Sequence, residues 1–218
     1  MSRKPRILIT GFGPFPGAPY NPTESLVARL MRLRRPLFDS IERFSHIFPV
    51  SYSAVDRDLP MLIATHQPNA LLMFGLAART THVRIETRAR NIVTQLWPDA
   101  EHADVSSRSI AGDAPFARPF GLHTEKLLRA ARATGIDARP SLSAGSYLCN
   151  YLSWRAIEAT DQISGPRLAA FIHVPLMPRD ASYHRTTATP AIDFEQLVDA
   201  GEALLVEMIK QVRHTAEM

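Results

Sequence analysis

Short apolar runs alternate along this chain with segments of helical periodicity. Residues 6–10 form an apolar run rich in β-branched side chains and ended by Gly11, as expected of a buried strand. The same pattern predicts strands at 46–52, 70–74 and 169–174, and a strand with alternating faces that begins at residue 83. Apolar residues at helical spacing predict helices at 21–33, 54–65, 123–134, 148–159 and 194–212.

Two of these helices carry recognisable start signals. Asn21 is a preferred N-cap residue, Pro22 suits the first helical position, and Glu24 is placed to close a capping box. Asp193 is the expected cap of the last helix. These signals make the first and last helices the best-defined elements of the pattern.

The alternation of strands and helices predicts an α/β fold. We expect a three-layer α/β/α sandwich with a mostly parallel, twisted mixed sheet, in a single domain that spans residues 1–218. The segment 97–121 is polar and rich in Pro and Gly, so we expect a long loop there, of the kind that often forms a lid or a binding element.

Composition excludes several classes of protein. A single cysteine among 218 residues rules out a disulfide scaffold and fits a reducing compartment, so we expect a cytoplasmic protein. No apolar run approaches the length of a membrane helix, and no membrane partner is expected. The net charge of +4 is spread over scattered arginines, which favours a solvated surface over nucleic-acid binding. The histidines show no close ligand pair, so no metal is predicted.

Three residue types needed for cysteine-nucleophile chemistry occur in well-defined segments. Cys149 is expected at a helix N-terminus, where unpaired N–H groups and the helix dipole favour a thiolate. His173 is expected at the carboxyl end of a buried strand. Glu86 shares one strand face with Arg84 and Arg88, which should keep it ionised. Taken singly, each also fits a structural role: a buried thiol, a hydrogen-bonded core histidine and a surface ion pair.

The glycine-rich segment 11–17 follows the first predicted strand. It matches neither a dinucleotide fingerprint nor a phosphate-binding loop, because Pro14 and Pro16 remove backbone donors. Phe12 and Phe15, set among prolines, suit a rigid apolar pocket wall as well as they suit a packed loop.

Four segments together resemble the motifs of the pyroglutamyl peptidase I family, the pyrrolidone-carboxylate peptidases. They are residues 10–15 (TGFGPF) with Asn21-Pro22; Gly75 followed by Ala78, Val83, Glu86, Ala89 and Asn91; residues 144–150 (AGSYLCN); and residues 171–175 (FIHVP). Their order and spacing extend from residue 6 to about residue 178. Four motifs in register are a far stronger signal than any one of them.

The resemblance implies a hydrolase that removes N-terminal pyroglutamyl residues from peptides without a cofactor. It implies that Cys149 is the nucleophile, that His173 acts as general base and then as acid, and that Glu86 orients the imidazole. Phe12 and Phe15 would line the pocket for the lactam ring, and Asn21 belongs to the same substrate-binding motif. The family also suggests a homotetramer.

Several positions depart from the family pattern. Leu76 stands where Gln is common, Arg84 where Ser or Thr is usual, and Thr87 where Lys or Arg follows the glutamate. Leu96 and Trp97 occupy a stretch where many members carry an arginine near the oxyanion. Two alternatives therefore stay open: a cysteine amidohydrolase of this fold that acts on another small acyl amide, and a catalytically silent binding protein that keeps the pocket.

Overall fold

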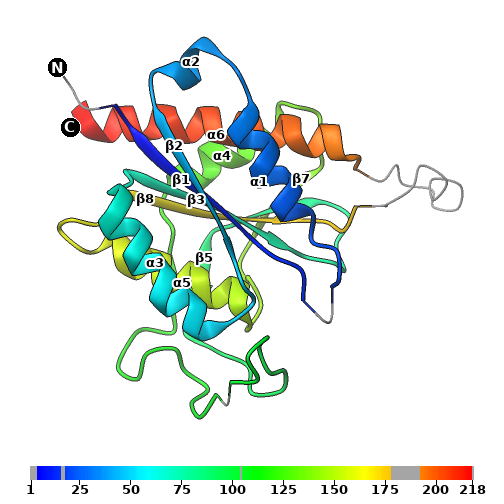
Figure 1. Cartoon of the computed structure of the whole chain (residues 1–218), viewed down its shortest axis with the longest axis vertical. Coiled ribbons are helices and arrows are strands. Elements are labelled where there is room, and N and C mark those ends of the chain that lie inside the picture. Colours follow the sequence, from blue (N-terminus) through cyan, green and yellow to red (C-terminus); the bar gives the residue numbers. More distant parts are fainter. Residues whose placement is uncertain (1–3, 16–17, 104, 178–191, 218) are drawn as a thin grey trace, which may run out of the picture.

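The computed structural model describes residues 4–15, 18–103, 105–177 and 192–217, built around a six-stranded sheet in the order β2-β1-β3-β8-β4-β7 (Figure 1). The strands are β1 (Arg6–Phe12), β2 (Glu42–Phe48), β3 (Ala70–Leu76), β4 (Val83–Glu86), β7 (Ala138–Ser141) and β8 (Leu168–Val174). Neighbouring strands are parallel except β4 and β8, which run antiparallel. The predicted mostly parallel mixed sheet is confirmed.

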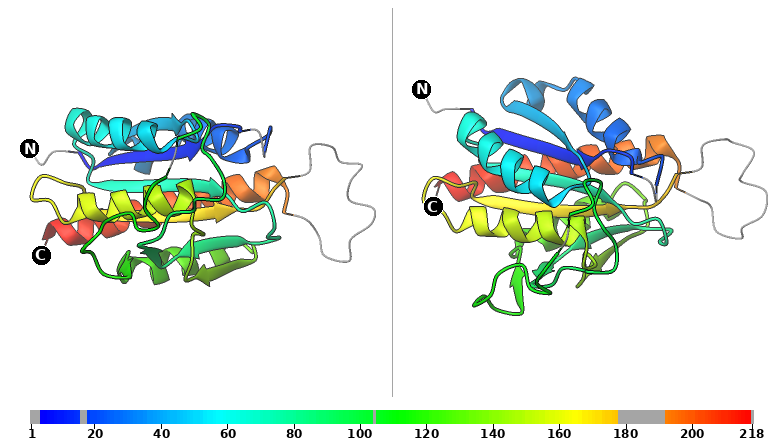
Figure 2. Two further views of the ribbon diagram at one scale, coloured as in Figure 1. Left: turned by 90° about the horizontal axis from the view of Figure 1, so that it is seen from below. Right: turned by 60° about the horizontal axis from the view of Figure 1, so that its bottom comes forward.

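Helices cover both faces of this sheet (Figure 2). They are α1 (Pro22–Arg32), α2 (Pro36–Asp39), α3 (Tyr52–His66), α4 (His123–Arg132), α5 (Leu148–Thr160) and α6 (Phe194–Glu217). Ile7 and Ile9 pack with α1, α4 and α6 on one face, whereas Leu8 packs with α3 and α5 on the other. This alternation follows from the two-residue period of a strand that is buried on both sides, and it produces the three-layer sandwich.

The two predicted cap residues, Asn21 and Asp193, cap their helices in the structure. The Asn21 side chain accepts a hydrogen bond from the Thr23 backbone N–H at 3.1 Å. Asp193 accepts one from Gln196 N–H at 2.8 Å, and the Gln196 side chain accepts one in return from the Asp193 backbone. In the described part of the chain, no helix is both long and apolar enough to cross a membrane.

The second strand lies earlier in the chain than the sequence pattern predicts. The expected strand at 46–52 is replaced by β2, which ends at Phe48, and by the start of α3 at Tyr52. Ser51 causes this change, because its hydroxyl accepts a hydrogen bond from Ala54 N–H and so caps α3. The apolar residues that suggested a longer strand instead straddle a strand–helix junction.

Three short strands, β5 (Arg88–Arg90), β6 (Ala117–Pro119) and β7, are not predicted from the sequence. β7 contains Pro140, which is tolerated because β7 lies at the edge of the sheet, where one row of N–H groups needs no partner. β5 pairs with β6 in a separate two-stranded sheet, so β6 interrupts the predicted loop at 97–121. The strand that begins at Val83 ends at Glu86, and Arg88 belongs to the separate strand β5.

The order of the strands positions the functional residues. β8 lies between β3 and β4, and His173 of β8 is in register with Gly75 on one side and Arg84 on the other. Val83 and Ile85 are buried in the core on the α6 side of the sheet, so Arg84 and Glu86 face the α5 side. The topology thus brings the segments of Glu86, His173 and α5 together at one end of the sheet.

Candidate active site

Cys149 is the second residue of α5 and is partly exposed. Its helix follows Tyr147, an extended N-cap residue whose side chain makes no capping hydrogen bond. The next residue, Asn150, is fully buried; its side chain accepts a hydrogen bond from Arg90 N–H and donates to the carbonyls of Arg90 and Ile92. This fixed junction holds the thiol at the start of the helix, where the dipole favours negative charge.

A glycine in the neighbouring strand makes room for the thiol. A Cβ atom at Gly75 would lie 2.8 Å from Cys149 Sγ and 2.6 Å from Phe171 Cζ, closer than real Cβ atoms come. The close approach of the Cys149 thiol and the Phe171 ring to β3 therefore favours glycine at this position. Gly75 belongs to the motif quoted above, but its role is visible only in three dimensions.

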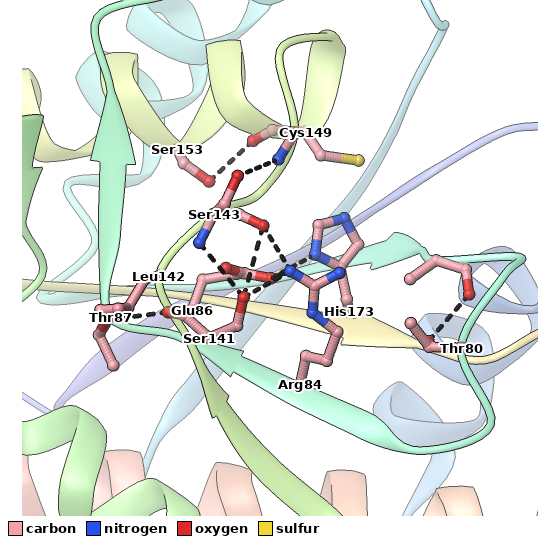
Figure 3. Close-up of polar contacts among 12 residues, drawn as sticks. Thr80, Arg84, Glu86, Thr87, Ser141, Leu142, Ser143, Cys149, Ser153 and His173 are labelled. Carbon is pink, nitrogen blue, oxygen red and sulfur yellow. Dashed lines mark hydrogen bonds and ion pairs between the residues drawn. The ribbon is translucent and has the colours of Figure 1, made fainter.

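His173 lies in the sheet within reach of both the thiol and the carboxylate (Figure 3). Its Nδ1 atom is 2.7 Å from Glu86 Oε1, and its side chain is only 6% exposed. Because an ionised carboxylate can only accept, Nδ1 carries the proton and donates it, which leaves Nε2 for Cys149. The Phe171 ring packs edge-on against the imidazole, with centroids 5.0 Å apart.

Opposing effects set the pKa of His173. Burial, the largest single effect, lowers the pKa. Cys149 and Glu86 each raise it through their charge and a hydrogen bond, and together they bring the pKa of His173 to about 9. The arrangement therefore favours the charged imidazolium form of His173. An imidazolium of this kind can deliver a proton to a leaving group.

Glu86 is completely buried. Burial raises the pKa of its carboxyl group, but the hydrogen bond and charge of His173, a hydrogen bond from Ser141 and the charge of Arg84 outweigh it, so the pKa is lowered. Arg84 Nη2 lies 3.1 Å from the same Oε1 atom that binds His173. Arg88, the other cation expected beside Glu86, instead donates to the Leu142 carbonyl.

The residues of the expected pocket wall lie around the end of β1. Phe12 is buried with its ring centroid 6.0 Å from that of Phe48, and Phe15 is half-buried against the same apolar cluster. Asn21 is also buried, and its amide donates to the Gly13 carbonyl while its oxygen accepts from Thr23. Through these contacts Asn21 holds the segment between the two phenylalanines. Pro16, which belongs to the glycine-rich segment 11–17, lies outside the described residues.

The positions that depart from the family pattern have different surroundings. Leu96 and Trp97 are 83% and 60% exposed. The residues on either side of them are held to the segment before Cys149 by two hydrogen bonds. Thr94 N–H donates to the Ser146 carbonyl, and the Tyr147 hydroxyl donates to the Pro98 carbonyl. Leu76 ends β3 and is half-buried. Thr87 donates its hydroxyl proton to the Ser141 carbonyl. The described residues contain no cluster of three or more His, Cys, Asp or Glu side chains suited to a metal.

Comparison with known proteins agrees with this geometry. A sequence profile described as Pyroglutamyl peptidase matches residues 5–211. The pyrrolidone-carboxylate peptidase of Thermococcus litoralis is 31% identical over 79% of this chain and 77% of its own length, and that of Pseudomonas fluorescens is 31% identical over 81% of each.

The solved structures that resemble this one are also pyrrolidone carboxyl peptidases. The pyrrolidone carboxyl peptidase from Thermococcus litoralis superposes with a TM-score of 0.85 at 28% identity, covering 98% of this chain and 96% of that one. The enzyme from Fervidobacterium islandicum superposes with a TM-score of 0.83 at 26% identity, covering 95% and 99%. With a profile match over nearly its whole length and this fold, the chain belongs to the pyroglutamyl peptidase family.

Proposed function

We propose that this protein is a cysteine peptidase that removes N-terminal pyroglutamyl residues from peptides, with Cys149, His173 and Glu86 as its catalytic triad. The observation that carries the proposal is the chain of contacts from the buried Glu86 through His173 to the thiol at the start of α5. Pyrrolidone-carboxylate peptidases among its relatives support the choice of substrate.

The first half of the reaction is acyl transfer to sulfur. The Cys149 thiolate attacks the carbonyl carbon of the pyroglutamyl residue, and backbone N–H groups around the start of α5 stabilise the oxyanion. The C–N bond then breaks while the His173 imidazolium gives its proton to the departing amine. The products of this step are a thioester on Cys149, a neutral imidazole and a peptide shortened by one residue.

Water completes the reaction. His173 now takes a proton from a water molecule, which attacks the thioester carbon; the C–S bond breaks, pyroglutamate leaves, and the thiolate and imidazolium are restored. Glu86 holds the ring through Nδ1 and stabilises its charged form in both halves. No cofactor enters this cycle.

Selectivity for the lactam would come from apolar walls. Phe12 and Phe15 offer a flat ring an aromatic environment, whereas an open glutamyl side chain would bring a charge that phenylalanine cannot solvate. Burial of that unpaired charge costs several kcal/mol or more, enough to exclude glutamyl substrates.

In the cell we expect a cytoplasmic enzyme, and the family resemblance suggests a homotetramer.

A second candidate is a cysteine amidohydrolase that acts on a different small acyl amide. Leu76 and the exposed Leu96 favour it, because they stand where polar residues are common in the family. A silent binding protein is a third possibility; a thiol without a catalytic partner should be alkylated slowly.

Release of a fluorophore from pyroglutamyl, prolyl and glutamyl amides separates these functions. We expect cleavage of the pyroglutamyl amide alone, and its loss in Cys149→Ser, which nearly preserves side-chain volume but replaces a thiolate with a weak nucleophile. Preference for another amide would favour the second candidate. No turnover of any amide, together with slow alkylation, would indicate a binding protein.

A further inference from the structure

Arg84 lies beside the triad, next to Glu86, as the strand period predicts. Its guanidinium group lies against Glu86 and also donates to the Ser141 hydroxyl and to the Ser143 carbonyl (Figure 3). The side chain is 23% exposed, so a cation that is usually solvated is largely removed from water. A partly buried arginine with carboxylate, hydroxyl and carbonyl partners is part of a built polar network.

The first consequence concerns charge. Glu86 Oε1 accepts a hydrogen bond from His173 and forms an ion pair with Arg84 Nη2 at 3.1 Å, so one buried carboxylate faces two cationic groups. An isolated carboxylate at 0% exposure would be strongly disfavoured, and a second cation helps to keep it ionised. Arg84 thereby stabilises the acid that orients the imidazole.

The second consequence concerns position. Ser141 ends β7, and the chain then runs through Ser143 to the N-cap of α5 and to Cys149. By binding Ser141 and Ser143, Arg84 fixes the start of this connection to β4, the strand that carries Glu86. One side chain thus connects the acid of the triad with the segment that leads to the nucleophile.

We propose that Arg84 is a positioning residue of the reaction, which holds Glu86 and the 141–143 segment in one array so that acid, imidazole and thiol stay aligned. The proposal rests on the proposed function and adds a fourth residue to its machinery. At this position, where Ser or Thr is usual in the family, the guanidinium of Arg84 connects β4 with the 141–143 segment.

Other ionisable groups near this array are few among the described residues. Cys149 and Glu86 act on His173, while His173, Ser141 and Arg84 act on Glu86. The pKa of His82 is lowered by burial and by the charges of Arg139 and Arg84, with Asp137 opposing them. The pKa of Tyr147 is raised by burial, Asp99 and Cys149. Arg84 is the one cation among these groups that contacts Glu86 besides the triad histidine, so its removal should act on the triad through Glu86 and the 141–143 segment.

The test compares Arg84→Lys and Arg84→Thr with the matched control Arg139→Thr. Arg139 is the register partner of Arg84 on β7, but it is exposed and pairs with Asp137, away from Glu86. Each protein is assayed for kcat and KM on a pyroglutamyl amide from pH 5 to 10, and for the rate of iodoacetamide alkylation of Cys149, the only cysteine in the chain. Circular dichroism and thermal unfolding report whether each variant is folded.

We expect Arg84→Thr to lower kcat about tenfold or more with a smaller change in KM, because alignment is lost and substrate contacts are not. Loss of a cation beside Glu86 should also move the pH–rate and pH–alkylation profiles upward by about half a pH unit. Arg84→Lys keeps the charge but loses the planar guanidinium group with its several N–H donors, so kcat should fall while the pH profiles stay in place. Arg139→Thr should behave as wild type.

Wild-type kcat and an unshifted pH profile in Arg84→Thr would overturn the proposal. If that variant does not fold, Arg84→Lys decides alone, and wild-type kcat in it is the contrary result. Absence of turnover in the wild-type protein would refute the proposed function instead, and the alkylation profiles would still test the role of Arg84.

Discussion

Replacement of Gly75 by alanine is a direct test of the geometry around the thiol. The added methyl carbon would lie 2.8 Å from Cys149 Sγ, whereas ordinary contacts of a Cβ atom lie between 3.4 and 4 Å. It would also lie 2.6 Å from Cζ of Phe171, whose side chain is fully buried and has little room to yield. We therefore expect the thiol to move by about 1 Å away from its position beside His173.

The size of the effect follows from that displacement. A shift of about 1 Å in a reacting group can cost about 10²-fold in rate, equivalent to roughly 2.7 kcal/mol in activation free energy. Overpacking should lower the free energy of unfolding by about 1–3 kcal/mol, which leaves a folded protein if its stability is ordinary. The loss should therefore fall on kcat and not on folding.

The assay measures kcat and KM on a pyroglutamyl amide, with thermal unfolding in parallel. Gly112→Ala is the matched control, because a methyl group there meets nothing within 4 Å and the backbone does not have a positive φ angle. The reasoning is refuted if folded Gly75→Ala keeps kcat within threefold of wild type. An equal loss in Gly112→Ala would show that the effect is not specific to the thiol.

Three further predictions address the triad and the pocket. Glu86→Gln should lower kcat about 10²-fold or more in a folded protein, because the amide cannot stabilise the imidazolium; full activity would make Glu86 a structural residue. Since the pKa of His173 is raised from 6.5 to about 9, its charged form stabilises the fold fully below pH 6.5, and that contribution disappears as the pH rises through about 9. Both kcat and the unfolding temperature should decline over this range, and a flat response of both to pH 10 contradicts the assignment. Phe12→Ala and Phe15→Ala should each raise KM for pyroglutamyl amides, as measured by initial rates, and unchanged KM values in both would place the lactam elsewhere.

Local pattern was enough to predict most of the framework. β1, β3 and β8 are continuous apolar runs because both faces of each strand are buried, and such runs are visible in the sequence. The first and last helices were predictable because Asn21 and Asp193 cap them through contacts within three residues. β7 was not predictable, since its four residues include Arg139 and Pro140 and it is a strand only because it lies against β4.

The sequence by itself determined the residue types and the local geometry of the site. The period of a strand places Arg84 and Glu86 on one face, and the start of a helix at Leu148 places Cys149 beside unpaired N–H groups. Both are short-range properties that depend on a few neighbouring residues. The family motifs could be recognised for the same reason, because each is a local pattern of this kind.

Only the tertiary structure decided which of these local features meet. The antiparallel insertion of β4 between β8 and β7 sets Arg84 opposite His173 and brings Glu86 within hydrogen-bond distance of the imidazole, across 87 positions of chain. It also brought Arg84 into contact with Ser141 and Ser143, and it placed Gly75 beside the thiol. Such pairings depend on strand order, which is settled by the burial of whole faces against several helices and is therefore absent from any local pattern.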